Sequence, residues 1–318
     1  MEKHVVTAQE AQQRIDKFVR KYLNNTPLSM IYKLFRKKEI RVNDKPVAED
    51  YILKENDEIK IYLPLAKEKF IVEQEYRPIK PNFKIVYEDD NVLVVNKEKG
   101  VIVHNAENKS YGTLTDQVIT YLVQKGLYDP KKKTFVPAPA HRLDRNTSGL
   151  VIYGKNMAAL QELNSAFKKQ EGLQKIYQVL IVGRVLETGK IELRLQKDAK
   201  EKKVRVVNRQ GLEALTFYRP LKISEKFSLV EATIKTGRTH QIRAHFAAIN
   251  HPVVGDKKYG NFQLNSDFKR QFNWENQFLH AHKLIFNNFN DTLKYLNGKI
   301  FQAELPNDKK TIIRKIFA

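Results

Sequence analysis

The sequence contains no cysteine, which excludes disulfide bonds and thiolate metal sites. It also has no apolar run near the roughly 20 residues that a membrane-spanning helix needs, and its first residues lack the apolar stretch of a signal peptide. We therefore expect a cytoplasmic protein without a membrane partner. Acidic residues are in the minority, because 57 Lys and Arg oppose 36 Asp and Glu, for a net charge of +21. This excess favours a polyanion partner.

One polar segment stands out, HRLDRNTSGL at residues 141–150, in which a single carboxylate lies between two arginines. The guanidinium groups of Arg142 and Arg145 should keep Asp144 ionised and offer it bidentate partners. The segment leads into a strand-like run at 150–153, so Asp144 can face a cleft from a rigid element. A surface ion-pair cluster would explain the same residues, because such pairs are common. The ten residues alone leave both interpretations open.

The same segment resembles the signature of the RluA-type pseudouridine synthases, which isomerise uridine in ribosomal and transfer RNA. Asp144 stands at the position of their catalytic aspartate. Further blocks of this family recur in the expected order along nearly the whole chain. They are NK with a following glycine at 96–100, VH at 103–104, KIY at 175–177, GRTHQIR at 237–243, GD and YG within 255–260, and LHA at 279–281. The resemblance implies an RNA pseudouridine synthase, an enzyme whose reaction needs no metal or other cofactor.

The resemblance also implies roles for four residues. Asp144 is the catalytic carboxylate, which either attacks C1′ or removes the C2′ proton, and the sequence does not separate these routes. Arg243 is its partner, Tyr177 stacks on the target base, and Arg142 enters the RNA when the target nucleotide flips out. Without the resemblance, an exposed arginine and a tyrosine in cross-strand packing would be the ordinary interpretations.

Closely spaced strand-like runs fill most of the chain from residue 84 onward, which predicts an α+β fold with a mostly antiparallel, mixed sheet. The resemblance adds a central cleft that holds the catalytic residues. Strands are expected at 85–87, 92–96, 150–153, 175–183, 189–196, 203–207, 213–218, 227–234, 277–286 and 299–304. Helices are expected from about 113 and at 157–169, 239–249 and 308–317.

The N-terminal part has a different pattern. An apolar stripe beginning at Ile15 and a second one beginning at Met30 predict two helices, and short strands are expected at 40–43 and 58–62. Together with the run RKKEIRVN at 36–43, this arrangement resembles the S4 domain, a small RNA-binding module. We assign residues 12–66 to it, 67–83 to a linker, and 84–318 to the catalytic domain.

Basic residues gather on and after the second of these helices. Like charges on one helix face are mildly destabilising, so a phosphate partner would explain them, although a solvated face is the alternative. The candidate RNA-binding residues are Lys33, Arg36, Lys37, Lys38 and Arg41.

The histidines could suggest a zinc site, but no HExxH motif or cysteine accompanies them, so we expect no metal. Four histidines within or beside the family blocks are expected to frame the cleft by hydrogen bonds instead. These are His104, His141, His240 and His280.

Within the family, the chain resembles the ribosomal large-subunit synthase C branch, through SMIY at 29–32 and the RN pair at 145–146. This implies modification of 23S ribosomal RNA, free or within an assembling large subunit. We also expect a monomer. The alternatives are a synthase for another 23S site or for transfer RNA, and a catalytically inactive RNA-binding assembly factor. A base-excising glycosidase is a third, but the family blocks lack the paired carboxylates that it would use.

Overall fold

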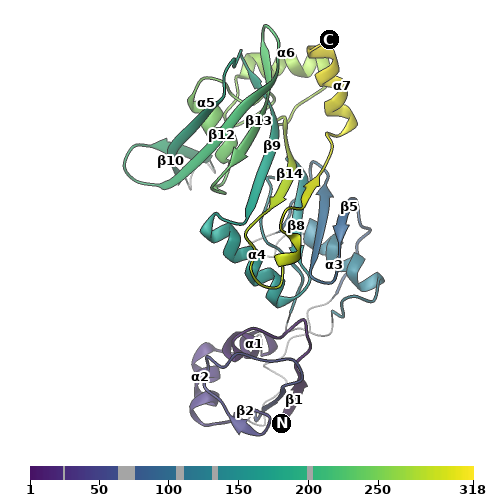
Figure 1. Cartoon of the computed structure of the whole chain (residues 1–318), viewed down its shortest axis with the longest axis vertical. Coiled ribbons are helices and arrows are strands. Elements are labelled where there is room, and N and C mark those ends of the chain that lie inside the picture. Colours follow the sequence, from purple (N-terminus) through teal and green to yellow (C-terminus); the bar gives the residue numbers. More distant parts are fainter. Residues whose placement is uncertain (24–25, 64–75, 105–110, 131–134, 199–202) are drawn as a thin grey trace.

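The computed structural model describes residues 1–318 except 24–25, 64–75, 105–110, 131–134 and 199–202. Two separate sheets organise the described residues, a small one near the N-terminus and a large one in the rest of the chain (Figure 1). The expected linker lies partly outside the described residues, at 67–75, and its remainder at 76–82 forms neither helix nor strand. No helix in the described part of the chain is both long and apolar enough to cross a membrane.

The small sheet has four antiparallel strands in the order β1-β4-β2-β3. Its strands are β1 (Glu2–Val5), β2 (Ile40–Val42), β3 (Lys45–Pro46) and β4 (Glu58–Ile61), and its helices are α1 (Ile15–Tyr22) and α2 (Leu28–Arg36). The expected boundary at residue 12 is too late, because β1 pairs with β4 over all four of its residues. None of the four side chains of β1 is fully buried, so no apolar alternation marks this strand in the sequence.

The two N-terminal helices bury their apolar stripes against the small sheet. Ile15 and Phe18 of α1 and Ile31 and Leu34 of α2 are almost fully buried in one core with β2 and β4. This core shares no residue with the clusters of the large sheet. The small unit therefore has the separate hydrophobic core that an independent domain needs.

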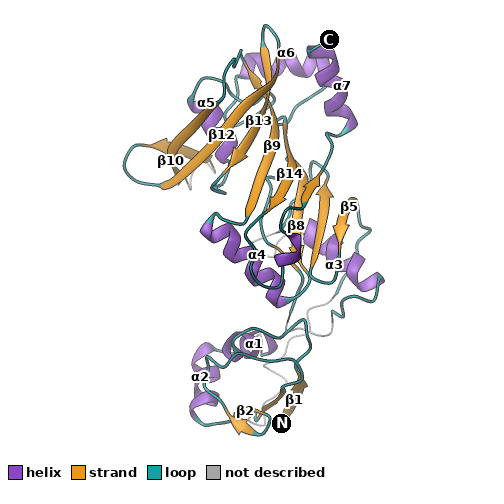
Figure 2. Cartoon of the chain, in the orientation of Figure 1, coloured by secondary structure: helices purple, strands orange, loops and turns teal. Residues whose placement is uncertain are grey.

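The large sheet has eleven strands, nine of them in the order β11-β10-β12-β13-β9-β14-β8-β6-β5, while β15 pairs with β14 and β7 with β8. Among these described pairs, only β8 and β14 run parallel, so the sheet is mostly antiparallel (Figure 2). The strands are β5 (Phe83–Glu88), β6 (Val92–Lys97), β7 (Ala138–Pro139), β8 (Ser148–Gly154), β9 (Leu173–Val182), β10 (Gly189–Asp198), β11 (Lys203–Val207), β12 (Leu212–Ile223), β13 (Phe227–Ile234), β14 (Leu279–Phe286) and β15 (Ile300–Gln302).

The remaining helices are α3 (Leu114–Gln124), α4 (Met157–Lys169), α5 (Gln241–Ala248), α6 (Phe262–Phe272) and α7 (Asn307–Ile316), together with a short 3-10 turn at Lys294–Leu296. Most expected elements agree with the structure to within two residues, although β12 runs five residues further than expected. Helix α6 is absent from the expectations. Phe268 is its only buried residue, so no apolar stripe indicates a helix there.

Strands β8, β9 and β14 form the middle of the large sheet and carry the site. The parallel pair brings Gly149 of β8 against Ala281 of β14, and a Cβ atom on Gly149 would lie only 2.2 Å from the Ala281 carbonyl oxygen. Gly149 also has a φ of +117°. Only glycine combines this backbone conformation with so close an approach, so the single glycine of the segment at 141–150 anchors that segment to the sheet.

Candidate active site

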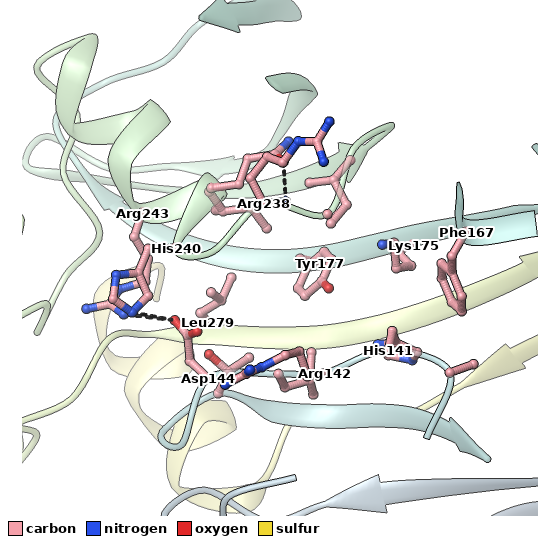
Figure 3. A pocket seen from close by; sticks show the side chains of 17 residues that line it. His141, Arg142, Asp144, Phe167, Lys175, Tyr177, Arg238, His240, Arg243 and Leu279 are labelled. Carbon is pink, nitrogen blue, oxygen red and sulfur yellow. Dashed lines mark hydrogen bonds and ion pairs between the residues drawn. The ribbon is translucent and has the colours of Figure 1, made fainter. Parts of the chain in front are cut away.

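A pocket of about 260 Å³ opens over the middle of the large sheet, between the loop before β8, strand β9 and the loop that leads into α5. Figure 3 shows Asp144 and Arg243 at one end, Tyr177 in the middle, and Lys175 and His141 at the other end. The pocket is slightly smaller than the roughly 300–1,000 Å³ of typical small-molecule sites. Its size suits a single nucleotide unit better than a large cofactor.

The loop that carries Asp144 is tied to the end of β6. The buried ammonium of Lys97 donates hydrogen bonds to the carbonyl oxygens of Glu98, Val101 and Arg145, at 2.9, 2.8 and 3.1 Å. Arg145 also exchanges hydrogen bonds with Gly100, through its Nε atom and through its carbonyl oxygen. These contacts fix the loop on both sides of its carboxylate, which a preorganised site requires.

Arg243 lies between two carboxylates. Its Nη1 atom donates to Asp144 Oδ2 at 2.8 Å, and its Nε and Nη2 atoms donate to the two oxygens of Asp256 at 2.6 and 2.8 Å. Asp256 is fully buried and Arg243 is 5% exposed, whereas the Asp144 side chain is 26% exposed. Arg243 and Asp256 therefore form a buried bidentate ion pair that supports Asp144. Of these three residues, Asp144 is the one that faces the pocket.

The carboxylates beside Arg243 keep its guanidinium charged. Burial alone would lower the pKa of Arg243, but the hydrogen bonds and charge of Asp256, followed by those of Asp144, raise that pKa overall. Asp256 is in turn held by the backbone N–H groups of Lys258 and Tyr259, which donate to its Oδ1 atom. The arrangement delivers one permanent positive charge to Oδ2 of Asp144.

The partner of Asp144 is thus a distant arginine. The expectation that Arg142 and Arg145 pair with Asp144 is wrong, since neither forms an ion pair with it in the described structure, whereas Arg243 does. Residues 141–147 form no strand. Arg142 lines the pocket and is exposed. Arg145 donates a hydrogen bond to the backbone carbonyl of Gly100 instead.

The loop into α5 is fixed by a buried glutamine. Gln241 accepts hydrogen bonds from the Thr236 hydroxyl and from the N–H of Arg238, and its Nε2 atom donates to the carbonyl oxygen of Leu215. His240 has a φ of +53°, so the helix begins at Gln241, two residues later than expected. The sharp entry turns Arg243 inward from the first turn of α5.

Tyr177 forms the middle of the pocket floor. It is 6% exposed and packs in the main core of the large sheet. Burial, and next the charge of Asp144, raise the pKa of its hydroxyl, so the ring is neutral. The structure thus brings all four predicted residues, Arg142, Asp144, Tyr177 and Arg243, to one pocket.

The expected frame of histidines is partly present. His240 lines the pocket 3.9 Å from Asp144 and contacts the Tyr259 hydroxyl at 2.9 Å, and burial lowers its pKa. His280 is buried between the hydroxyl of Ser148 and the carbonyl oxygen of Ala303. His141 lines the pocket, but His104 is exposed and is not among the lining residues.

Sequence reasoning assigned no role to Asp256, Lys175 or Arg238, although each lies in a quoted family block. Asp256 could have been found from Gly255, which has a φ of +76° and whose added Cβ would lie 2.2 Å from the Asn276 carbonyl oxygen. A GD pair at such a tight turn indicates a carboxylate placed by the backbone. No local signal reveals that Lys175 would be buried.

The basic residues of the small unit lie far from this pocket in sequence. Lys33, Arg36, Lys37 and Lys38 are exposed, and Arg41 is partly exposed, with its guanidinium carbon 5.4 Å from the ring centre of Tyr62. Among the described residues, no cluster of three or more His, Cys, Asp or Glu side chains could hold a metal ion.

Residues 91–248 match the family described as RNA pseudouridylate synthase. The ribosomal large subunit pseudouridine synthase C of Escherichia coli (strain K12) is 32% identical over 319 residues, which cover 96% of this chain and 92% of that protein. The chain belongs to the RNA pseudouridylate synthase family. The protein of the same name from Vibrio cholerae is 33% identical over 287 residues, 87% of this chain and 85% of that protein. This synthase is therefore an enzyme that isomerises uridine in RNA.

Solved structures agree with the fold. Human RNA Pseudouridylate Synthase Domain Containing 1 aligns with a TM-score of 0.51 at 25% identity, over 74% of this chain and 95% of that chain. Human RNA Pseudouridylate Synthase Domain Containing 4 aligns with a TM-score of 0.57 at 21% identity, over 73% and 92%. The predicted α+β class of the synthase, with its mostly antiparallel sheet, is confirmed.

Proposed function

We propose that this synthase converts specific uridines of 23S ribosomal RNA to pseudouridine, as a cytoplasmic monomer that acts on free RNA or on an assembling large subunit. The names of the Escherichia coli and Vibrio cholerae relatives support the ribosomal substrate. The net charge of +21 suits a large polyanion.

Pseudouridine formation breaks the N1–C1′ bond, turns the uracil and joins C1′ to C5. C5 then loses its proton to solvent and N1 takes one up, so atoms and electrons balance without a cofactor. In the proposed mechanism Asp144 acts through Oδ1. Arg243 occupies Oδ2, and no group in the described part of the chain hydrogen-bonds Oδ1. That oxygen is available to attack C1′ or to take the C2′ proton.

Arg243 and Asp256 have positioning roles in this proposal. Asp256 uses both of its oxygens to orient the guanidinium, which leaves Nη1 aimed at Asp144. The arginine holds the carboxylate plane of Asp144 in one orientation, which favours attack from a fixed position. Because both carboxylate partners of Arg243 are already in place, the orientation of its guanidinium is fixed.

Tyr177 and Arg142 handle the base in the proposed mechanism. The neutral ring of Tyr177 stacks on the extruded uracil, a contact worth about 1–3 kcal/mol. Arg142 is exposed at the pocket rim, where its planar cation can fill the space that the flipped nucleotide leaves.

The small N-terminal unit is proposed to be an S4 domain that grips RNA by shape and phosphate. Its two helices, four-stranded sheet and separate core support this assignment, with the unit now extended to begin at β1. Lys33, Arg36, Lys37, Lys38 and Arg41 are proposed to contact phosphates. Domain limits near residues 66 and 83 remain those expected from the sequence.

The observation that carries the proposal is the single short contact between Arg243 and Asp144 in a pocket floored by Tyr177. It is tested by tritium release from RNA labelled at uridine C5, with large-subunit ribosomal RNA and bulk transfer RNA as separate substrates. Wild type and an exposed-site control, Asp291→Ala, should release tritium from the ribosomal RNA. Asp144→Ala should lose at least about 10⁴-fold in rate while it still binds RNA.

Two other outcomes would change the conclusion. Release from transfer RNA alone would overturn the 23S assignment and keep the chemistry. Salt-sensitive binding by all three proteins without release from either RNA would leave the inactive RNA-binding assembly factor.

A further inference from the structure

Four lysines of the described chain are buried, and three of them have oxygen acceptors. Lys97 donates to three carbonyl oxygens. Lys155 pairs with Glu88 and a backbone carbonyl, and Lys309 donates to the Ser148 hydroxyl and the Leu279 carbonyl oxygen. A buried ammonium is costly without such partners. In these three lysines, hydrogen bonds to oxygen acceptors offset that cost.

Lys175 is the fourth buried lysine, and it has no oxygen acceptor in the described structure. The residue is 8% exposed, and within the described part of the chain its Nζ atom makes no hydrogen bond or ion pair, although Nζ itself keeps some contact with solvent in the pocket. Its neighbours are the ring of Phe167, whose centre is 4.8 Å from Nζ, and Gly237, where an added Cβ would lie 3.1 Å from Nζ. An aromatic face offsets only part of the lost hydration. Lys175 is therefore a buried cation whose counter-charge the described protein does not supply.

The ammonium faces the pocket. Lys175 lies two residues before Tyr177 on β9, so both side chains are on the same face of the sheet, about 6.6 Å apart along the strand. Figure 3 shows Lys175, Phe167 and His141 together at the end of the pocket away from Asp144. Asp144 is the only carboxylate among the described residues that line the pocket.

His141 adds a second donor. Its Nε2 atom accepts a hydrogen bond from the N–H of Ile152 at 3.4 Å, which places the proton of the neutral ring on Nδ1. Burial, and next the charge of Lys175, lower the pKa of His141 to about 3, so the ring is neutral. Nδ1 is buried and forms no hydrogen bond of normal geometry in the described structure, while the backbone of Arg142 lies near the ring and opposes the lowering of its pKa. A buried N–H group without an acceptor is rare in native proteins.

We infer that Lys175 and His141 bind a phosphate of the RNA backbone, one of the two that flank the target uridine. This inference rests on the proposed function, because it places the uracil on Tyr177 and its ribose at Asp144. A phosphodiester offers both the negative charge that Lys175 lacks and an oxygen for the Nδ1–H group of His141. A uracil carbonyl would satisfy a hydrogen bond but leave the ammonium uncompensated.

Other groups of the same pocket agree with an anion. Arg142 and Arg238 line it between the Asp144 end and the Lys175 end, and both are cations. Gly237 is exposed and has no side chain, so the loop above Lys175 leaves room for a backbone to approach closely. The subsite would hold the RNA strand in register while the base is turned.

The test uses a fragment of large-subunit RNA with a neutral methylphosphonate in place of either phosphate that flanks the target uridine. The dissociation constant is measured by fluorescence anisotropy with the full chain, beside tritium release. The proteins are wild type, Lys175→Met, and Lys190→Met as a control that loses one charge at a site 63% exposed on β10.

For wild type, one of the two methylphosphonates should weaken binding about 10- to 100-fold, the range expected for a charge-assisted hydrogen bond. Lys175→Met should weaken binding of the unmodified RNA by the same factor. In Lys175→Met the same methylphosphonate should cost less than about threefold more, because its partner is already gone. Lys190→Met should behave as wild type.

Three results separate the possible failures. Full sensitivity of Lys175→Met to the methylphosphonate that weakens binding of wild type, or no sensitivity of wild type to either methylphosphonate, overturns the phosphate subsite. The second of these needs no variant, so it holds even if Lys175→Met does not fold. Loss of affinity in Lys175→Met, with no tritium release by wild type, overturns the proposed function and keeps the subsite.

Discussion

Arg243 and Lys175 lie at opposite ends of one pocket and are buried to a similar degree, 5% and 8% exposed. Arg243 directs three nitrogen atoms at the carboxylates of Asp144 and Asp256. Lys175 has an aromatic ring and a glycine beside it and no anion in the described chain. Burial does not distinguish the two cations, but their partners do. A buried charge that the protein neutralises holds a site in shape, whereas one left without a partner is poised for a ligand.

The largest effect is expected from removing Arg243, at the end of the pocket where the protein itself neutralises the cation. Arg243→Met leaves the fully buried Asp256 without its counter-ion. We expect the free energy of unfolding to fall by about 3–5 kcal/mol and tritium release to be lost. Urea unfolding and the release assay measure the two effects. Unchanged stability would show that the charge of Asp256 is solvated in some other way.

A second substitution sharpens this test. Arg243→Met combined with Asp256→Asn removes the uncompensated charge and should recover part of the lost stability, but none of the activity, because Asp144 still lacks its cation. Equal stability of the single and double variants would contradict the assignment of the loss to Asp256.

The next comparison sets two buried lysines side by side. Lys309→Met removes the donor to the Ser148 hydroxyl and the Leu279 carbonyl oxygen, and should lower stability by about 1–3 kcal/mol. Lys175→Met removes a charge that has no partner, so its stability should equal or exceed that of wild type. Chemical denaturation of both variants measures the difference. A loss in Lys175→Met as large as that in Lys309→Met would mean that Lys175 is structural.

RNA binding at the Lys175 end of the pocket should also depend on pH. Burial lowers the pKa of Lys175 to about 8, so above that pH the free enzyme must take up a proton to bind a phosphate. The dissociation constant for RNA should rise about tenfold between about pH 7 and about pH 9 in wild type, and less in Lys175→Met. His141 does not titrate in this range, since burial lowers its pKa to about 3.

The smallest effect is expected from the exposed cations of the small unit. Lys37 is exposed and has no ion pair in the described structure, so Lys37→Ala should weaken RNA binding only about two- to threefold. The slope of the logarithm of RNA affinity against the logarithm of salt concentration should fall by about one, the value for one lost phosphate contact. Lys54→Ala, an exposed lysine outside α2, serves as the control. A change as large as that in Lys175→Met would contradict the distinction between surface and buried cations.

Much of the fold was predictable because hydrophobic periodicity is a local property. The order of elements from β5 to α7 follows from apolar runs and turns, and only weakly amphipathic elements escaped. Helix α6 buries one residue, and β1 has no fully buried side chain, so neither has a pattern to recognise. Both are held by neighbours that lie elsewhere in the sequence.

The candidate site was predictable to the extent that motif residues meet in space. Asp144, Tyr177 and Arg243 were expected together, and one pocket holds all three. The partner of Asp144 could not be found from its neighbours in the chain, because Arg142 and Arg145 lie beside it but form no ion pair with it in the described structure. Its partner lies 99 residues away in α5.

Which chemical groups this protein has, and which elements carry them, follows from the order of its residues. Which charges are neutralised depends on how distant segments meet in the fold. The entry of α5 at His240 and the tight turn at Gly255 bring Arg243 onto Asp256, while β9 places Lys175 under Gly237 with no carboxylate of the described chain beside it. Periodicity acts over a few residues, whereas charge pairing depends on distances of a few ångströms between distant segments, which only sheet register and helix placement set.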